Sequence, residues 1–464
     1  MNRLALRNLF GRPLRTVLTT LAILLGVAMI SGTYVLTDQI TNAFDGMFAT
    51  AYKGTAAIVT PKNVLGGLDD ESAGLTIPES MLADVRAVDD VASATGGAEA
   101  MTAVLVGGEV VETGGAPAFV MASDDIAMRN VGWKAGAAPT RAGEVVVDAG
   151  FAGRNGVAVG DRIGLATAKG VKPVTVSGIF TFGDSLSLGG TIMVGARATD
   201  VQRWFDMRGE LTAISVTAQP GVSPEDLAAR LRAELPASVE VRTGEQAAQD
   251  SAADVSQVID SSLRPALLAF GGVAVFVGAF IIFNAFSITV AQRRREFAML
   301  RSFGASRRQV LASVVAEALI MGVAASLAGM FAGLGVAKGV GALFKAFGAD
   351  FPLAGLGLEP RTVVVALIVG IGTALAAALV PAVRATRIPP VAALQEGAGM
   401  PASRLSRFTT PAAAGVALAG GGLVALGFFG DAATTTRLLE MGLGAMLLFV
   451  AIAMVARHVV RPLA

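Results

Sequence analysis

Residues 264–293 read RPALLAFGGVAVFVGAFIIFNAFSITVAQR, with no charged side chain between Arg264 and Arg293. A helix that spans a bilayer needs about 20 consecutive, mainly apolar residues, so this stretch is long enough to cross a membrane. Five further windows have the same character. The sequence therefore predicts a polytopic α-helical membrane protein with about six transmembrane helices, at 16–37, 265–292, 310–337, 362–383, 408–430 and 438–456.

Composition supports this class and excludes others. The mean hydropathy is +0.63, hydrophobic residues make up 53% of the chain and charged residues only 16%. The formal net charge of +1 gives no reason to expect nucleic acid as a partner. With no cysteine and one histidine, thiolate zinc sites, disulfides, Cys–His nucleophiles and multi-histidine metal centres are excluded. We expect no catalytic residue, metal or cofactor on this chain.

The first apolar window allows two interpretations. Four arginines precede it, as in the basic region of a cleaved signal peptide. However, the apolar run is long, and the nearest small-residue cleavage pattern, Ala49–Ala51, lies well beyond its end. These features favour an uncleaved anchor.

Basic residues in the short loops predict the orientation, because cytoplasmic loops carry an excess of Lys and Arg. Three loops on one side hold fourteen arginines, and two loops on the other hold four basic residues. The N-terminus is therefore expected in the cytoplasm, and the large segment 38–264 outside it. The composition is typical of a GC-rich bacterial genome, so the expected location is the bacterial plasma membrane. The basic loops are 1–15, 293–309 and 384–407; the opposite loops are 338–361 and 431–437.

Residues 38–264 are long enough to fold as a domain of their own. They hold 29 acidic and 17 basic residues. Capping signals at Pro78-Glu79 and at Ser223–Asp226 predict helices. Thr243 and Gln246 fit a capping box, which opens a helix leading into the second span. We predict a mixed α/β domain joined to the membrane by two helical stalks, residues 38–52 being the other. The β-like runs are Val104–Val106, Ala118–Met121, Glu144–Val147, Val174–Phe180, Thr191–Val194 and Ala213–Thr217.

No catalytic pattern is found in this domain. It has no histidine to act as a base, and G-x-S-x-G is absent. Asp124-Asp125 and Asp69–Glu71 are the candidates for Ca²⁺, but neither has the spacing of an EF-hand loop. Solvated turns are the better interpretation of both.

The loop after the second span has the sharpest local pattern. Phe297, Leu300 and Phe303 recur at i, i+3 and i+6, Gly304 is a helix stop, and Ser306 with Gln309 forms a capping box. The pattern predicts a short amphipathic helix between two spans. One interpretation is a helix bound to anionic lipid; the other is a docking helix for a soluble partner. The aromatic residues and the defined stop favour docking.

With these residues in view, the chain resembles the permeases of MacB/FtsX-type ABC transporters over about residues 1–397. The most specific match is the pattern R-R-E-x-A-x-L-R-x-x-G-A-S within 294–306. Arg7-Asn8-Leu9 before the first span, and the run from Pro381 to Leu394 after the fourth, are also similar. The segment Gly143–Val147, followed by Val159-Gly-Asp161, resembles the periplasmic domain of that family.

The resemblance implies a permease that moves an outer domain with energy from ATP. The chain has no G-x-x-x-x-G-K-[ST] sequence, so ATP and Mg²⁺ are expected on a separate cytosolic ABC ATPase. The loop would then be the coupling helix. The expected partner-binding residues are Arg294, Arg295, Glu296, Phe297, Leu300, Arg301, Phe303 and Gly304.

The family unit has four spans, whereas two further spans follow here. The chain therefore resembles the first half of a longer two-unit permease, and a second permease half or a homodimer mate is expected. Three functions stay open: export or extraction of an amphiphile, lipoprotein or peptide; a non-transporting regulator of an envelope enzyme such as a cell-wall hydrolase; and a membrane-anchored binding receptor.

Polar and small residues within the spans yield three further expectations. A lone carboxylate inside a span is costly, so Glu317 is expected either to pair with Arg294 or Arg295 or to accept hydrogen bonds at the cytoplasmic interface; a coupling role and a simple interfacial salt bridge both stay open. Asn284 is expected to bond to a neighbouring span. Two glycine pairs with small-xxx-small spacing, Gly329/Gly333 and Gly335/Gly339, predict close helix packing.

Overall fold

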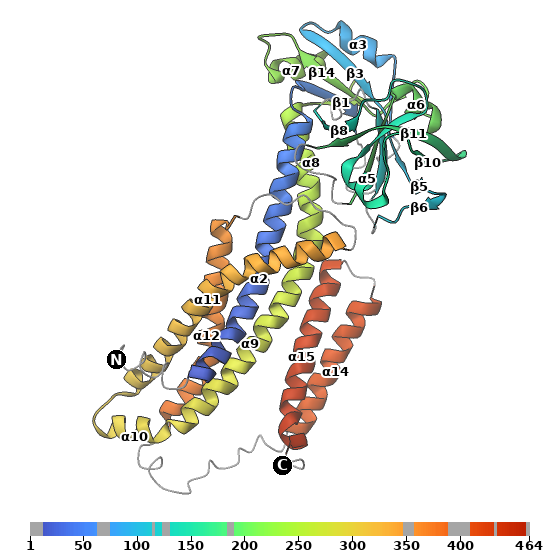
Figure 1. Cartoon of the computed structure of the whole chain (residues 1–464). Helices are drawn as coiled ribbons and strands as arrows, with labels where there is room; N and C mark the ends of the chain where they lie inside the picture. Colours follow the sequence, from blue (N-terminus) through green and yellow to red (C-terminus); the bar gives the residue numbers. More distant parts are fainter. Residues whose placement is uncertain are drawn as a thin grey trace. The chain divides into compact units, whose positions relative to one another are not determined.

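A computed structural model describes residues 13–62, 75–113, 117–122, 130–182, 190–346, 357–387, 409–430 and 434–460 (Figure 1). The chain divides into two compact units. One comprises residues 1–38, 257–340 and 356–464, and we call it the helical unit. The other comprises residues 39–256 and 341–355, and we call it the α/β unit.

The helical unit confirms the predicted class. Among the described residues, six helices are long and apolar enough to cross a membrane. The short helix α10 (Arg294–Ser302) lies between the second and third of them in the chain. The long helices are α2 (Pro13–Ala51), α9 (Arg264–Gln292), α11 (Arg307–Ala346), α12 (Pro360–Arg387), α14 (Thr409–Phe429) and α15 (Thr434–Val460).

Glycines let α2 pack closely against two neighbours. A Cβ added at Gly278 of α9 would lie 2.7 Å from the Ala22 carbonyl oxygen of α2. Gly329 and Gly333 of α11 are as close to α2, as their spacing predicted. The second pair differs: a Cβ at Gly335 or Gly339 would meet nothing within 4 Å among the described atoms. Two residues further along, the helix presents a different face, so the second pair does not contact α2.

The last two helices form a hairpin attached to α9. Gly420 of α14 and Gly444 of α15 bring their backbones together. The Phe449 ring of α15 makes edge-to-face contacts with Phe276 and Phe280 of α9, at centroid distances of 5.9 and 5.3 Å. An apolar cavity of about 450 Å³ lies between α9, α12 and α15.

A four-stranded antiparallel sheet, in the order β15-β1-β14-β3, forms one core of the α/β unit. Helices α3 (Met81–Ala87) and α7 (Pro224–Glu234) pack on it through Val85, Leu227 and Leu231, all fully buried. A short pair of strands, β2 (Ile77–Pro78) and β13 (Glu210–Leu211), lies beside this core. The four strands are β1 (Ala57–Pro61), β3 (Val91–Gly97), β14 (Ala213–Ala218) and β15 (Val239–Thr243).

A nine-stranded mixed sheet forms the second core, in the order β4-β7-β12-β9-β11-β10-β5-β6, with β8 also paired to β11. The pairs β9/β11 and β7/β12 are parallel and the others antiparallel. Helices α5 (Ala149–Asn155) and α6 (Ala198–Trp204) contribute Phe151 and Val201 to its core. The strands are β4 (Glu99–Thr102), β5 (Val104–Val106), β6 (Glu109–Val110), β7 (Ala118–Ala122), β8 (Gly132–Gly136), β9 (Glu144–Asp148), β10 (Arg162–Thr167), β11 (Gly170–Thr181) and β12 (Ile192–Ala196).

Each predicted β-run in this domain coincides with a strand. Both capping signals near the C-terminal side of the domain are formed: Ser223 Oγ accepts from the Asp226 N–H at 3.1 Å, and Thr243 Oγ1 accepts from the Gln246 N–H at 3.1 Å. The helix expected from Pro78-Glu79 begins instead at Met81, because Ile77 and Pro78 pair with β13. The two acidic runs weighed for Ca²⁺ lie outside the described residues.

Both stalk segments are helical. Helix α2 continues without a break past Asp38 to Ala51. On the other side, α8 (Gly244–Val258) leads through a five-residue π-helix, η2 (Ile259–Leu263), into α9. A π-helix is rare and often occurs at functional sites, so η2 distinguishes this second connection from the uninterrupted α-helix of the first.

Candidate functional site

The sequence between the second and third spans folds into α10, a helix with defined ends. Glu296 places an acid in its first turn, and Gly304, with φ of +96°, ends the turn that follows it. The next helix starts at the predicted capping box, in which Gln309 Oε1 accepts from the Ser306 N–H at 2.8 Å and Ser306 Oγ from the Gln309 N–H at 3.2 Å. The chain therefore fixes this segment between two spans at both ends.

One side of α10 is anchored in the helical unit. Phe297 is 5% exposed and packs with Ile282 and Phe286 of α9 and Val310 of α11. This differs from the sequence interpretation, which grouped Phe297 with Leu300 and Phe303 on one partner-binding face. Successive residues of a helix are turned by about 100° around its axis, so Phe297, Leu300 and Phe303 do not point in the same direction. Of these three, the neighbouring spans cover only Phe297. Phe297 thus holds the helix in place.

Arg293 joins α10 to α9 and α11. Its Nε donates to Glu296 Oε2 at 2.9 Å, and its Nη1 lies 3.5 Å from Glu317 Oε2. Its guanidinium also lies over the Phe297 ring, 5.2 Å from the centroid. The sequence interpretation missed this residue, although the i, i+3 spacing of Arg293 and Glu296 was a visible signal.

The other side of α10 is exposed and apolar. Met299 is 50% exposed, Leu300 46% and Phe303 86%, and Arg301 is half-buried beside them. Met299 was not among the predicted residues. The side chains of Arg294 and Arg295 lie outside the described residues, although their backbone forms the first turn. Met299, Leu300 and Phe303, with Arg301 beside them, form the exposed surface Met299–Phe303.

The two polar residues predicted inside spans have different environments. Glu317 is largely buried, with a side chain 14% exposed, and forms an ion pair with Arg293; the predicted partners Arg294 and Arg295 have side chains outside the described residues. Asn284 is exposed on α9, and the described contacts include no hydrogen bond from its side chain to a neighbouring span. Glu317 therefore belongs to the α10 site and Asn284 does not.

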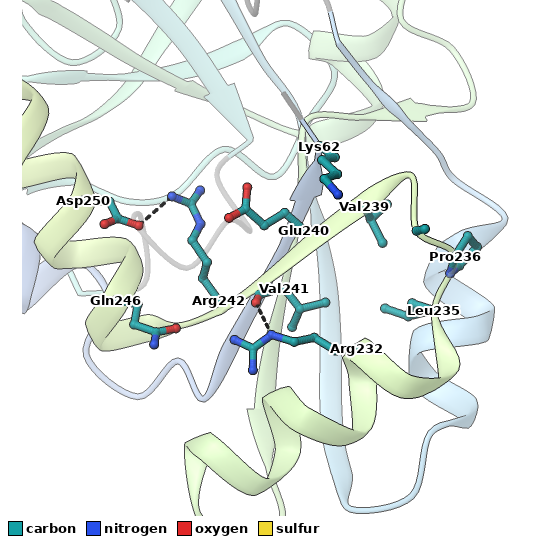
Figure 2. Close-up of a pocket in the computed structure, with 11 residues that line it drawn as sticks. Lys62, Arg232, Leu235, Pro236, Val239, Glu240, Val241, Arg242, Gln246 and Asp250 are labelled. Carbon is teal, nitrogen blue, oxygen red and sulfur yellow. Dashed lines mark hydrogen bonds and ion pairs between the residues drawn. The ribbon is translucent and has the colours of Figure 1, made fainter. Parts of the chain in front are cut away.

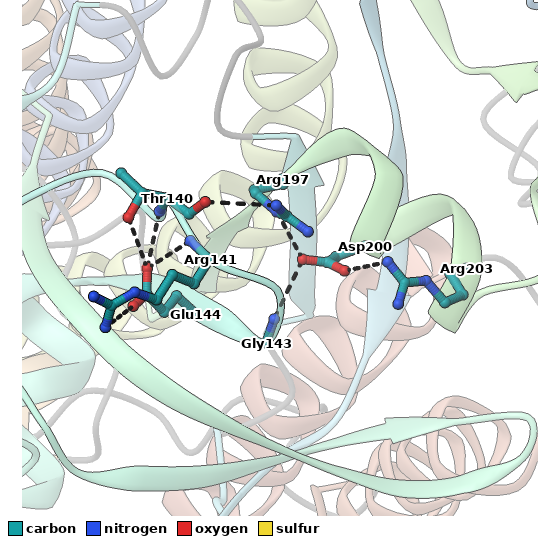
Figure 3. Close-up of polar contacts among 7 residues, drawn as sticks. All are labelled: Thr140, Arg141, Gly143, Glu144, Arg197, Asp200 and Arg203. Carbon is teal, nitrogen blue, oxygen red and sulfur yellow. Dashed lines mark hydrogen bonds and ion pairs between the residues drawn. The ribbon is translucent and has the colours of Figure 1, made fainter.

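A polar network in the α/β unit involves the motif at Gly143-Glu144 (Figure 3). Asp200 is 1% exposed, and its carboxylate accepts from Arg197 Nε at 3.0 Å, Arg203 Nη2 at 2.8 Å and the Gly143 N–H at 3.3 Å. Glu144 Oε2 accepts from the Thr140 and Arg141 N–H groups at 2.9 and 2.8 Å, and these bonds lower the pKa of the Glu144 carboxyl. These carboxylates accept from the backbone N–H groups of Thr140, Arg141 and Gly143, so the network fixes the loop that precedes β9.

Asp148 is a second buried carboxyl in this unit. It caps α5, accepting from the Phe151 N–H at 2.8 Å, and also accepts from the Met193 N–H at 3.0 Å. Burial raises the pKa of Asp148 to about 6, against the lowering effect of these two backbone donors. It links β9, α5 and β12, and we assign it a structural role.

A cavity of about 850 Å³ borders the edge strand β15 (Figure 2). Part of its charged lining is engaged within the protein: Arg242 Nη1 donates to Asp250 Oδ2 at 2.8 Å, and Arg232 Nε donates to the Val241 carbonyl at 2.9 Å. Across the described ranges, no group of three or more His, Asp or Glu side chains is placed to hold a metal ion. The α10 surface is therefore the candidate functional site.

Comparison with known proteins gives two family matches. Residues 16–234 match the MacB-like periplasmic core domain, and residues 268–390 match the FtsX-like permease C-terminal domain. An uncharacterized ABC transporter permease protein of Mycobacterium tuberculosis is 30% identical over 263 residues, covering 55% of this chain and 30% of that protein. The macrolide export ATP-binding/permease protein MacB 1/2 of Paracoccus denitrificans is 30% identical over 31% of this chain and 21% of its own length.

Among solved structures, the periplasmic region of MacB from Actinobacillus actinomycetemcomitans is matched at 15% identity and a TM-score of 0.33, covering 42% of this chain and 92% of that one. The chain spans no more than about a third of the length of the named curated relatives.

The fold defines the class: a multi-pass membrane protein with six candidate spans and an α/β domain between the first two. Within that class, the paired family matches identify the chain as a member of the MacB/FtsX-like family of ABC transporter permeases.

Proposed function

We propose that α10 is the coupling helix of this permease, and that a separate cytosolic ABC ATPase docks on its exposed surface. The observation that carries the proposal is that one side of α10 is buried against neighbouring helices while the other side is exposed. Phe297 is 5% exposed and fixes one side, while Phe303, 86% exposed, stands on the other. Aromatic residues, methionine and arginine are enriched at protein interfaces, and Phe303, Met299 and Arg301 are residues of these types.

The proposed orientation places α10 and the N-terminus in the cytoplasm and the α/β unit outside it. The support is charge: the loop 293–309 alone carries six arginines, and residues 38–264 carry 29 acidic against 17 basic residues. The proposed location is a bacterial plasma membrane.

The proposed activity is export or extraction of an amphiphile, lipoprotein or peptide, driven by motion of the α/β unit. The apolar cavity between α9, α12 and α15, lined by phenylalanine, alanine, valine and methionine, supports an amphiphilic substrate. A second candidate is regulation of an envelope enzyme without transport. The cavity at β15 supports this candidate, because five of its eleven lining residues are charged, as in a site for a polar partner rather than for a lipid-like substrate.

The proposal predicts that Leu300→Asp or Arg301→Glu uncouples the permease from its ATPase. The full-length chain would be purified with its ATPase in lipid nanodiscs, and both binding and ATP hydrolysis would be measured. Placing a carboxylate at a desolvated apolar contact should weaken binding at least about tenfold. Arg308→Glu makes the same charge reversal at an exposed residue outside α10 and should retain binding.

Full binding and full stimulation of hydrolysis by both α10 variants, with folding unchanged, would contradict the docking assignment. If those variants instead lost affinity for anionic vesicles, α10 would be a lipid-surface helix.

A further inference from the structure

Four charged residues from α2, η2, α9 and α12 meet at one end of the helical unit. Asp38 of α2 is 6% exposed, and the guanidinium of Arg361 of α12 faces it with both branches: Nε lies 3.4 Å from Oδ2, and Nη2 bonds Oδ1. Arg264, the first residue of α9, places Nη2 3.9 Å from the same Oδ1. Asp260 of η2 completes the group, with Oδ1 2.5 Å from Arg264 Nη1.

The two arginines also share the aromatic ring of Tyr34. The guanidinium carbons of Arg264 and Arg361 lie 5.9 and 5.8 Å from the ring centroid, within the range of cation–π attraction. Arg264 Nε further lies 3.4 Å from Thr37 Oγ1. Tyr34, Thr37 and Asp38 share one face of α2, so each arginine contacts that face through at least two side chains. We call Tyr34, Asp38, Asp260, Arg264 and Arg361 the Asp38 cluster.

Elementary electrostatics explains why the carboxylate is needed. Arg361 stands in the first turn of α12, where the helix dipole is positive and a cation is unfavourable, whereas Arg264 lies within the helical run of α8, η2 and α9. A buried carboxylate without a partner costs considerably more. Bringing Asp38 to both arginines relieves both costs, and the bidentate contact with Arg361 fixes geometry as well as charge. Removing Asp38 would take the carboxylate partner from Arg361 and leave Arg264 paired with Asp260.

The cluster lies next to η2. Residues 259–263 form the π-helix, and Arg264 is the first α-helical residue after it. Helix α2 has no such interruption between Pro13 and Ala51. Of the two helices that lead out of the helical unit, one is therefore continuous, and the other has irregular hydrogen bonding next to the point where the cluster holds it.

We propose that Asp38 is a positioning residue for energy coupling. The Asp38 cluster makes α9 and α12 move as one body with α2. A displacement that starts at α10 is then transmitted along α2, which is continuous. On the other side, η2 deforms and takes up the difference in movement between α9 and α8. The proposal rests on the function proposed above and adds the residues that transmit the motion.

Spin labels test the transmission in the full chain with its ATPase. The chain has no cysteine, so Thr436→Cys in the helical unit and Lys172→Cys in the α/β unit, both exposed, give two unique attachment points. The label-to-label distance would be measured with and without ATP. Asp38→Asn and Arg361→Gln should reduce the ATP-dependent shift at least about fivefold, while binding and stimulation of the ATPase stay at the level of the unsubstituted chain.

The control is Asp206→Asn, which removes an exposed ion pair with Lys169 and should leave the shift unchanged. Because Asp38 and Arg361 act through each other, the double variant should be no worse than either single variant. An unchanged shift in both single variants, or additive losses in the double variant, would overturn the proposal.

Hydrogen exchange on the chain alone separates failure of this proposal from failure of the proposed function. Amides at 267–271 and 363–367 should exchange at least about tenfold faster in Asp38→Asn and in Arg361→Gln than in Asp206→Asn. Unchanged exchange would overturn the cluster's role without reference to any ATPase. If the unsubstituted chain showed no ATP-dependent shift, the coupling function itself would be wrong. Arg361, with a side chain 51% exposed, provides a variant that should fold even if Asp38→Asn does not.

Discussion

Gly333→Val should separate α11 from α2, whereas Gly339→Val on the same helix should be tolerated. A Cβ at Gly333 would lie 2.1 Å from Ser31 Oγ, 2.9 Å from the Gly32 nitrogen and 3.1 Å from the Ala28 carbonyl oxygen. The same atom at Gly339 would meet nothing within 4 Å. The two substitutions add the same side chain to the same helix, so any difference between them reports the contact with α2.

The magnitude follows from which neighbours can move. Ser31 can rotate away, although it would give up contacts at 3.4 Å with the Ala28 and Gly329 carbonyls. The Gly32 nitrogen is backbone, so it can move only if the two helices move apart. Overpacking of this kind costs about 1–3 kcal/mol. Separation would also weaken the contacts of Gly329 with Val27.

Thermal stability in one detergent measures the effect. Midpoints for loss of the monodisperse protein would be compared at one heating rate, because unfolding of a membrane protein of this size is not expected to be reversible. Gly333→Val should lower the midpoint by several degrees, and Gly339→Val should leave it within error of the unsubstituted chain. Equal midpoints for the two variants would refute the packing argument, and so would a larger loss for Gly339→Val.

Two further predictions concern the α/β unit and the C-terminal hairpin. Burial raises the pKa of Asp148 to about 6 from an ordinary 3.8, so the folded state favours the protonated carboxyl. Protonation of Asp148 therefore contributes about 3 kcal/mol to the free energy of unfolding. This contribution is complete at low pH and is lost as pH rises through 6. Asp148→Asn should remove that fall between about pH 4 and 6.5, as measured by urea unfolding followed through the two tryptophans, both in the α/β unit; an unchanged pH profile would contradict the assigned burial. Phe449→Ala should weaken attachment of the hairpin to α9 by about 1–3 kcal/mol, since two edge-to-face contacts are lost. In a chain co-expressed as two pieces split after Met400, that variant should reduce co-purification, whereas Leu418→Ala, at a position 79% exposed, should not.

Local signals in the sequence predicted most of the fold. The apolar windows correspond to six helices, because span length is fixed by bilayer thickness and by helical rise alone. The capping boxes at Thr243 and Ser306 formed as predicted, since each involves residues three apart. Sheet order was not predictable in this way. The parallel pairing of Glu144–Asp148 with β11 joins segments separated by helix α5 and strand β10.

The α10 site was predicted in position but not in orientation. Periodicity places Phe297, Leu300 and Phe303 near one another, yet it cannot say which of them the neighbouring spans will cover. That depends on Ile282 and Val310, which approach from two other helices. The same limit explains Glu317: its position inside a span predicted an arginine partner, and the chain offered several candidates within one loop.

Charged residues that border the apolar windows in the sequence come together in the folded chain. Asp38, Arg264 and Arg361 each mark the end of an apolar window, and read singly they only delimit spans. In the folded chain they meet, and at the α10 end Arg293, Glu296 and Glu317 meet likewise. Between these two charged groups, α2, α9 and α11 touch through glycines with backbone in close contact, a packing that leaves little room for one helix to slide on another. A force applied at α10 would then move these helices together, and through α2 and α9 it would reach the Asp38 cluster, which also holds α12.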